Sequence, residues 1–159
     1  MYYRAISQNK WLTVISEDNY SGDSITGDLR THGNSLSVWK LDEVNEKLVD
    51  YYCIMTAINR DSLAKVDYVI FDDNDFDAIG VKLNQVDGIC DAFTDENIKK
   101  NHYDLIQIGY NQLGKIAKLI HDKVKSGKIA TITKKDMKDK INNCPFVDKS
   151  KLPDNFFKN

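Results

Sequence analysis

Alternating apolar and polar positions at residues 27–42 (GDLRTHGNSLSVWKLD) predict a β-hairpin. Gly33-Asn34 is a two-residue turn signal between two stretches of extended-chain residues. With this turn, side chains that alternate along each strand place four residues on an apolar face: Leu29, Thr31, Leu36 and Val38. The opposite face is polar and aromatic, with Asp28, Arg30, His32, Ser35, Ser37 and Trp39.

Two further strands and a helix are predicted in the segment after the hairpin. Apolar residues at steps of three and four predict a helix from an N-cap at Asp42 to about Asn59. The run KVDYVIFDD (65–73) is mostly β-branched and aromatic, which predicts a buried strand. IGVKLNQV (79–86) alternates apolar and polar residues and predicts another strand.

The C-terminal half is expected to be helical. A wide apolar stripe predicts one long helix over 94–126, with Gly127 just beyond its end. A shorter helix is expected from a cap at Thr133 to about Asn142. The segment 143–159 is expected to wrap over the surface as a tail. Together the elements predict a single α+β domain over 1–159, with an antiparallel or mixed sheet packed against the long helix.

Composition narrows the class of protein. The chain has 159 residues, of which 42% are apolar and 29% charged, with a net charge of −2, as in ordinary globular domains. No run approaches the length of a membrane span, and no apolar leader segment is evident, so a cytoplasmic protein without membrane contact is expected. Three widely spaced cysteines fit a reducing compartment better than disulfides or a zinc site. The basic helix near the C-terminus lacks interleaved aromatic residues, so no nucleic-acid surface is predicted.

The polar hairpin face is the first candidate site. Arg30 and His32 could bind an anion or move a proton, with Asp28 orienting one of them. A solvated outer face of the sheet explains the same residues without any function. Trp39 on this face is harder to explain as a merely solvated residue, because exposed tryptophans are frequent anchors at protein interfaces; cover by the C-terminal tail is the alternative.

The acidic run FDDNDFDAIG (71–80) is the second candidate. Asp73, Asp75 and Asp77 match the start of a calcium-binding loop, but Ala78 replaces the turn glycine and Asn84 replaces the bidentate glutamate. No metal site and no cofactor are therefore predicted. An acid-rich turn after a buried strand is the simple interpretation. The functional one makes Asp72, Asp73, Asp75 and Asp77 an acidic patch for a basic partner.

Two resemblances bear on function. Arg4 followed by Ser35-x-Ser37 loosely resembles ADP-ribosyltransferase-type sites, but these also need a late catalytic glutamate on a strand, and the last glutamate, Glu96, is predicted at a helix start. The segment LRTHGNSLSVWKLD, followed by a helix and VDYVIFD, resembles a set of small uncharacterised bacterial proteins over about residues 25–125. That resemblance implies a bacterial cytoplasmic origin and carries no activity, cofactor or site residue.

The resulting hypothesis is a non-catalytic protein-binding module, of the immunity or antitoxin type, that masks a partner protein such as a toxin. Its expected contact surface combines Arg30, His32 and Trp39 with the aspartates at 72–77. The alternative is a small hydrolase or transferase acting on a nucleotide or phosphorylated ligand. In that alternative Arg30 and His32 contact the phosphate, while Asp72 or Asp73 holds a metal. A third hypothesis, a subunit of a larger assembly, places Trp39 between copies of the chain.

Overall fold

The chain folds around a six-stranded antiparallel sheet, and the structure, a computed structural model, describes residues 1–12, 14–16, 19–42 and 47–158. The order of the strands across the sheet is β6-β7-β4-β1-β5-β8. Their bounds, in that order, are Lys82–Gln85, His102–Ile106, Leu36–Lys40, Tyr2–Ile6, Val66–Phe71 and Ile129–Ile132. Two short strands, β2 (Val14–Ser16) and β3 (Asn19–Tyr20), pair separately. The predicted α+β class is therefore confirmed.

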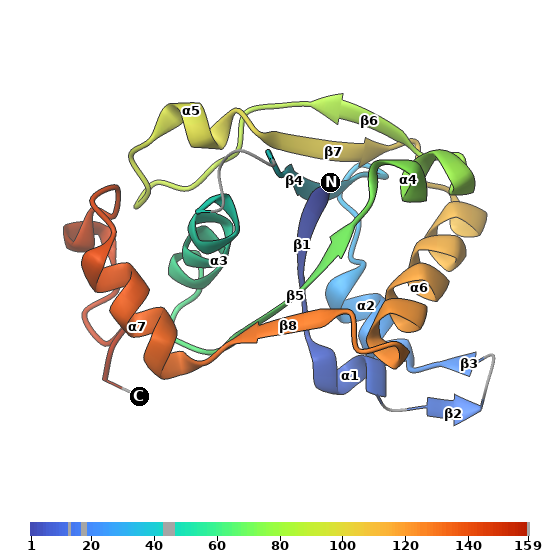
Figure 1. The fold of residues 1–159 in the computed structure, drawn as a ribbon, viewed down its shortest axis with the longest axis horizontal. Helices are drawn as coiled ribbons and strands as arrows, with labels where there is room; N and C mark the ends of the chain where they lie inside the picture. The colour runs from blue at the N-terminus through green and yellow to red at the C-terminus, as the bar shows by residue number, and fades with distance from the viewer. Residues whose placement is uncertain (13, 17–18, 43–46, 159) are drawn as a thin grey trace.

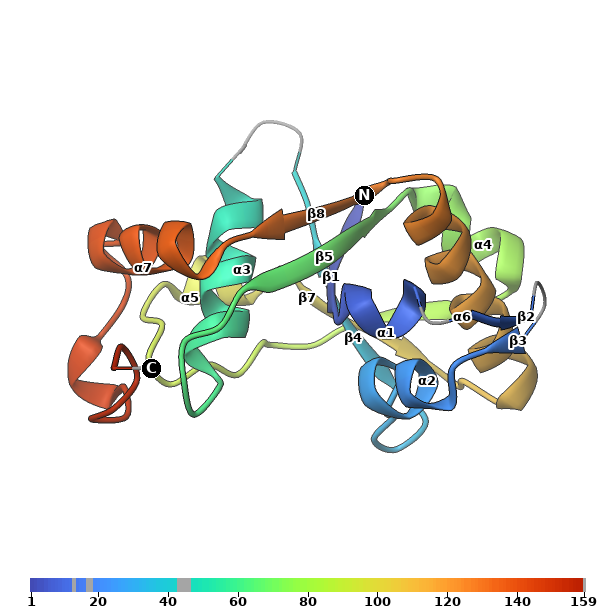
Figure 2. The same cartoon turned by 90° about the horizontal axis from the view of Figure 1, so that it is seen from below.

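Helices cover both faces of the sheet (Figures 1 and 2). On one side lie α3 (Leu48–Ile58), α5 (Glu96–Lys99) and α7 (Lys134–Asn143). On the other lie α1 (Gln8–Leu12), α2 (Gly22–Asp28), α4 (Asp73–Ile79) and α6 (Tyr110–Lys125). A 3-10 turn, Lys149–Lys151, follows α7. Within the described ranges, no helix is both long enough and apolar enough to cross a membrane.

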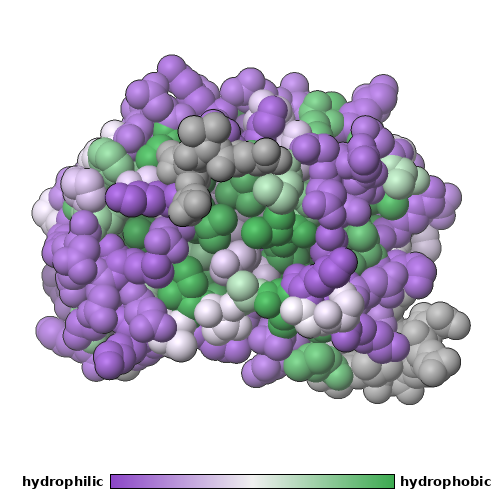
Figure 3. Space-filling model, in the orientation of Figure 1, coloured by the Kyte–Doolittle hydropathy of each residue, from purple (hydrophilic) through white to green (hydrophobic). Residues whose placement is uncertain are grey.

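The sheet therefore separates two hydrophobic cores. In β1, Tyr3 packs into the core under α3, whereas Tyr2 and Ile6 point into the core under α6. β5 divides in the same way, with Val66 on the α3 side and Phe71 on the α6 side. A strand buried on both faces needs apolar residues at successive positions, which explains the continuous apolar run predicted at 65–73. In Figure 3, apolar residues gather near the centre of the face shown, and hydrophilic residues cover its flanks.

The hairpin at 27–42 is confirmed at its turn and wrong in its first strand. Gly33 and Asn34 both have positive φ (57° and 60°), and one bridge joins His32 to Ser35. The preceding residues form α2 and an irregular segment instead of a strand. β4 pairs with β1 on one side and β7 on the other. These long-range partners leave no place in the sheet for a strand at 28–32, which local alternation could not reveal.

The long helix expected over 94–126 is three elements. Asp95, not Thr94, caps the short α5, since its carboxylate accepts hydrogen bonds from two backbone N–H groups. β7 then inserts between β6 and β4, and α6 begins only at Tyr110. Pairing on both sides outweighs the helical spacing of the β7 residues. The end of α6 agrees with expectation, because Gly127 lies just beyond it with a φ of 69°.

The remaining boundaries differ by a few residues. α3 begins at Leu48 rather than after Asp42, and the expected first turn at 43–46 lies outside the described residues. The strand predicted at 79–86 is confined to β6, because Ile79 ends α4. The last helix is confirmed: the Thr133 hydroxyl caps α7 by accepting from the Asp136 backbone N–H. In the segment 143–159, the Phe156 ring is buried in the α3-side core.

Candidate functional site

The predicted contact residues do not form one surface. Arg30 and His32 are exposed just before β4, near its N-terminal end. The aspartates at 72–77 follow β5, which ends at Phe71. Tyr2 of β1 pairs with Phe71 on one side and with Lys40, the last residue of β4, on the other. Arg30 and His32 therefore lie near one end of β4, and the aspartates lie near the other end. The proposed combination of these residues into a single site has no geometric support.

Trp39 is half-buried within a packed cluster. Its ring stacks on Tyr52 of α3 and meets His102 of β7 edge-on, with centroids 5.1 Å and 4.8 Å away. A Cβ atom at Gly88 would lie 2.2 Å from the Trp39 ring, so only glycine fits there. The face of β4 expected to be open to water is thus the face covered by α3. The interpretation of Trp39 as an exposed anchor is wrong for this reason.

Asp28 does not orient Arg30 or His32. Its carboxylate accepts hydrogen bonds from the backbone N–H and hydroxyl of Ser7, at 2.6 and 2.9 Å, and from the Trp11 indole at 2.7 Å. These contacts anchor the start of α1 to the end of α2. Asp28 is therefore a structural acid, and the hairpin arrangement that gave it a catalytic neighbour is absent.

The acidic run forms α4: Asp72 is its N-cap, and Asp73 and Asp75 lie in its first turn, where the helix dipole stabilises negative charge. The Asp75 carboxylate accepts from the Asp72 backbone N–H at 2.8 Å and from Lys123 Nζ at 2.9 Å. Asp73 pairs with the N-terminal amine of Met1 at 2.8 Å. Part of the patch's charge is thus already neutralised within the chain. In the described part of the chain, no three His, Cys, Asp or Glu side chains are grouped to hold a metal ion.

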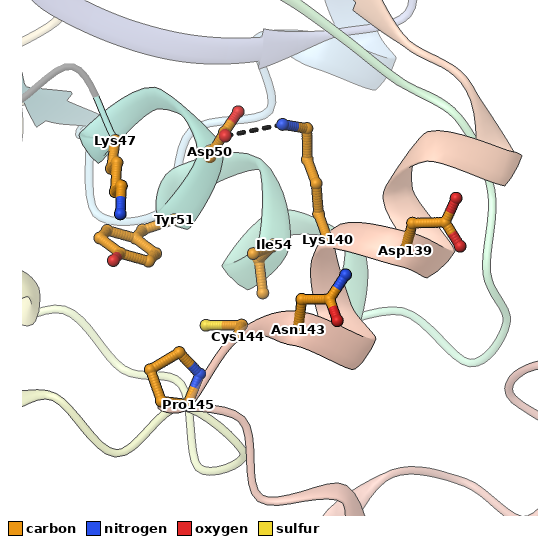
Figure 4. A pocket seen from close by; sticks show the side chains of 9 residues that line it. All are labelled: Lys47, Asp50, Tyr51, Ile54, Asp139, Lys140, Asn143, Cys144 and Pro145. Atoms are coloured by element: carbon orange, nitrogen blue, oxygen red, sulfur yellow. Dashed lines mark hydrogen bonds and ion pairs between the residues drawn. The ribbon is translucent and has the colours of Figure 1, made fainter.

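A groove between α3 and α7 is a more coherent candidate (Figure 4). Its volume is about 360 Å³, within the size range of binding pockets. Tyr51 and Ile54 of α3 and Cys144 after α7 form the apolar part of its lining. The salt bridge between Lys140 Nζ and Asp50 Oδ2, 2.6 Å long, connects the two helices across one side.

Local sequence explains why these helices enclose the groove. α3 is apolar around nearly its whole circumference, which requires cover on both sides: the sheet on one and α7 on the other. α7 supplies that cover with Met137 and Ile141, both fully buried. Its lysines at 134, 135 and 138 remain exposed on the opposite side. The groove lies between the N-terminal half of α3 and the C-terminal end of α7.

Four ionisable groups of the groove are held in neutral or mutually paired forms: Tyr51, Cys144, Lys140 and Asp50. Burial raises the pKa of Tyr51, and Cys144, Asp95 and Asp50 raise it further. Burial also raises the pKa of the Cys144 thiol, which keeps it protonated and a poor nucleophile. Lys140 and Asp50 neutralise each other. The arrangement suits binding of an apolar group with charges around it, and it contains no activated nucleophile.

This groove could not be predicted from the sequence, because its two walls are about 90 positions apart. The one usable signal is the all-round hydrophobicity of α3, which indicates a second layer above it without naming α7. Exposed apolar side chains were also missed: Tyr110, within the range whose apolar stripe predicted a packed helix, is 91% exposed, Ile89 is 85% exposed and Leu12 is 53% exposed.

In comparisons with known proteins, no protein-family model, no curated protein and no solved structure matches the chain.

Proposed function

We propose that the chain is a non-catalytic protein-binding module and that its partner docks into the groove between α3 and α7. The observation that carries the proposal is the groove itself, a concave surface with apolar residues in its floor and charged residues at its rim. Interfaces are built in this way, with an apolar centre and a polar rim. The raised pKa values of Tyr51 and Cys144 support binding over chemistry.

The rim indicates what kind of segment the partner presents. Lys47 and Lys140 contribute positive charge, and Asp50 and Asp139 contribute negative charge. A partner segment with one large apolar side chain, flanked by charges of both signs, complements this rim. Docking of that kind covers a surface of the partner, as an immunity or antitoxin protein covers the active surface of a toxin. We propose a toxin as this partner.

The test is site-specific crosslinking in the native cell. A photoreactive residue at the exposed Asn143, on the groove rim, is expected to crosslink to one stoichiometric partner. The same probe at Lys115, an exposed position on α6, serves as the matched control and is expected to give little product. A second variant, Asn143→Trp, fills the groove and should abolish co-purification of that partner. Equal crosslinking from both positions, or no stoichiometric partner, contradicts the proposal.

The two other hypotheses gain no support from the placement of their residues. The hydrolase or transferase needs Arg30 and His32 beside Asp72 or Asp73, and these pairs lie toward opposite ends of β4. The assembly subunit needs Trp39 at an interface between copies, and Trp39 is packed between α3 and β7 of its own chain.

A further inference from the structure

The two central strands of the sheet separate part of the way along their length. β1 and β4 pair only at Tyr2–Lys40 and Tyr3–Trp39. Beyond this point β1 continues beside β5, and the first half of β4 continues beside β7. A cleft of about 290 Å³ lies at the separation, lined in part by Tyr3, Arg4, Ser37, Trp39 and Thr56. Where two central strands separate, backbone N–H and C=O groups lose their strand partners, which is unusual in the interior of a protein.

Arg4 fills part of this separation with its side chain. Its guanidinium donates to the backbone carbonyls of Ser37 in β4 and Asp28 at the end of α2. Both acceptors are uncharged, and the buried Nε has no hydrogen-bond acceptor among the residues described. The Asp28 carboxylate is already bound to Ser7 and Trp11. Arg4 thus carries its charge at the cleft without a carboxylate in salt-bridge contact within the described chain.

Burial disfavours the charged form of the Arg4 guanidinium. Desolvation lowers the pKa of Arg4 to about 10, and the attraction of Asp28 opposes that shift without cancelling it. A guanidinium has five donors and its full charge at neutral pH, so an incompletely compensated one is an attractive position for an anion. An anionic ligand in the cleft would supply the missing counter-charge.

The walls of the cleft add a second recognition element. The half-buried Trp39 presents aromatic surface, and stacking on Tyr52 fixes its ring, whereas Tyr3 is fully buried and meets Tyr52 at a tilted angle. Thr56 contributes a hydroxyl, 3.1 Å from the Tyr3 hydroxyl. Rigid aromatic surface beside a few polar groups is the usual lining of a small-molecule site. The volume limits the occupant to a small ligand.

We propose that this cleft binds a small molecule that combines a planar ring with one anionic group, the ring against Trp39 and the anion toward Arg4. Two sources share this chemistry: nucleoside monophosphates and aromatic carboxylates. The site is separate from the α3–α7 groove and does not depend on the proposed function. It also gives a role to Arg4 and Ser37, which the sequence had singled out and which the structure brings into contact.

The test uses AMP, benzoate and inorganic phosphate as probes in calorimetric titrations of the full chain, with tryptophan fluorescence as a second readout. Saturable binding of AMP or benzoate is expected, and whichever binds identifies the source. Arg4→Gln should weaken that binding at least about tenfold, the loss expected for a charge-assisted hydrogen bond. Arg30→Gln, which removes an exposed arginine outside the cleft, should leave the affinity within about twofold.

Circular dichroism checks that Arg4→Gln folds. Where it does not, Ala5→Leu serves instead, because Ala5 lines the cleft and a larger side chain would fill it. Loss of binding in the folded variant supports the site. The proposal is overturned if neither AMP nor benzoate binds, or if the folded variant binds as tightly as the wild type. It is also overturned if inorganic phosphate binds as tightly as the ring-bearing probes.

Discussion

Tyr52 of α3 holds β4 in two ways: its ring stacks on Trp39 at 25° between planes, and its hydroxyl donates to the Lys40 carbonyl at 2.6 Å. Tyr52 is fully buried, and burial raises the pKa of its phenol, so the donor stays protonated. This pair of contacts ties the middle of the sheet to the helix that covers it. Trp39 therefore contributes to folding, and only the part of its ring that lines the Arg4 cleft is left for a ligand.

Replacement of Trp39 tests that conclusion directly. Trp39→Ala removes a large ring packed between Tyr52 and His102, and we expect it to lower the free energy of unfolding by about 3–5 kcal/mol. Trp39→Phe keeps an aromatic ring and should cost clearly less. Guanidinium unfolding followed by circular dichroism measures both. A Trp39→Ala protein with unchanged stability would restore the interpretation of Trp39 as a solvent-facing anchor.

His102 should make stability depend on pH. Desolvation lowers its pKa in the folded state, against a smaller opposing effect of Asp104. The unfolded chain therefore takes up a proton near pH 6.5 that the folded protein resists, and stability falls as the pH drops below that value. Between about pH 7.5 and about pH 5.5 the wild type should lose more stability than His102→Gln. Parallel losses in the two proteins would contradict this assignment.

Lys123 is expected to matter more than other lysines of α6. Its Nζ lies 2.9 Å from Asp75 and 3.7 Å from Asp72, and its side chain is only 11% exposed. Lys123→Met keeps the apolar stem but leaves two carboxylates without their cation, so we expect a loss of about 1–3 kcal/mol in unfolding free energy.

Lys118→Met provides the matched control. Lys118 pairs with Asp122 at 3.5 Å and is 64% exposed, and exposed pairs contribute less than about 1 kcal/mol. Thermal and denaturant unfolding of both variants, at low and high salt, measures the difference. Equal effects would mean that the acidic end of α4 does not depend on Lys123.

The three cysteines should be nearly inert in the folded protein. All are free and buried, and burial raises the pKa of Cys53 to about 12 and also raises those of Cys90 and Cys144. Few thiolates are present near neutral pH, so reaction with a disulfide reagent should be slow until the chain unfolds. Cys144 is the least buried of the three and should react first; Cys144→Ser identifies its contribution. Rapid native labelling of Cys53 would contradict the burial described.

Local signals in the sequence predicted the elements that depend on neighbouring residues. The Gly33-Asn34 turn, the cap at Thr133 and the end of α6 before Gly127 follow from backbone preferences of a few adjacent residues. The buried strand β5 also follows from its own composition. These features need no knowledge of the rest of the chain.

Features decided by distant segments could not be predicted in this way. His102–Ile106 has spacing compatible with a helix, and it forms a strand because β6 and β4 flank it. The site prediction failed for the same reason: an open face was inferred for Trp39 because nothing near it in sequence indicated that α3 covers it. Likewise, the α3–α7 groove and the Arg4 cleft arise from segments far apart in the chain.

The place of β8 at the edge of the sheet has a consequence for synthesis on the ribosome. β5 gains its outer neighbour only when residues 129–132 have emerged, about 60 positions after β5 itself. Until then the nascent chain exposes an apolar strand edge, which favours association with a chaperone or with another unfinished chain. A premature stop before β8 should therefore give an aggregating fragment rather than a smaller folded protein.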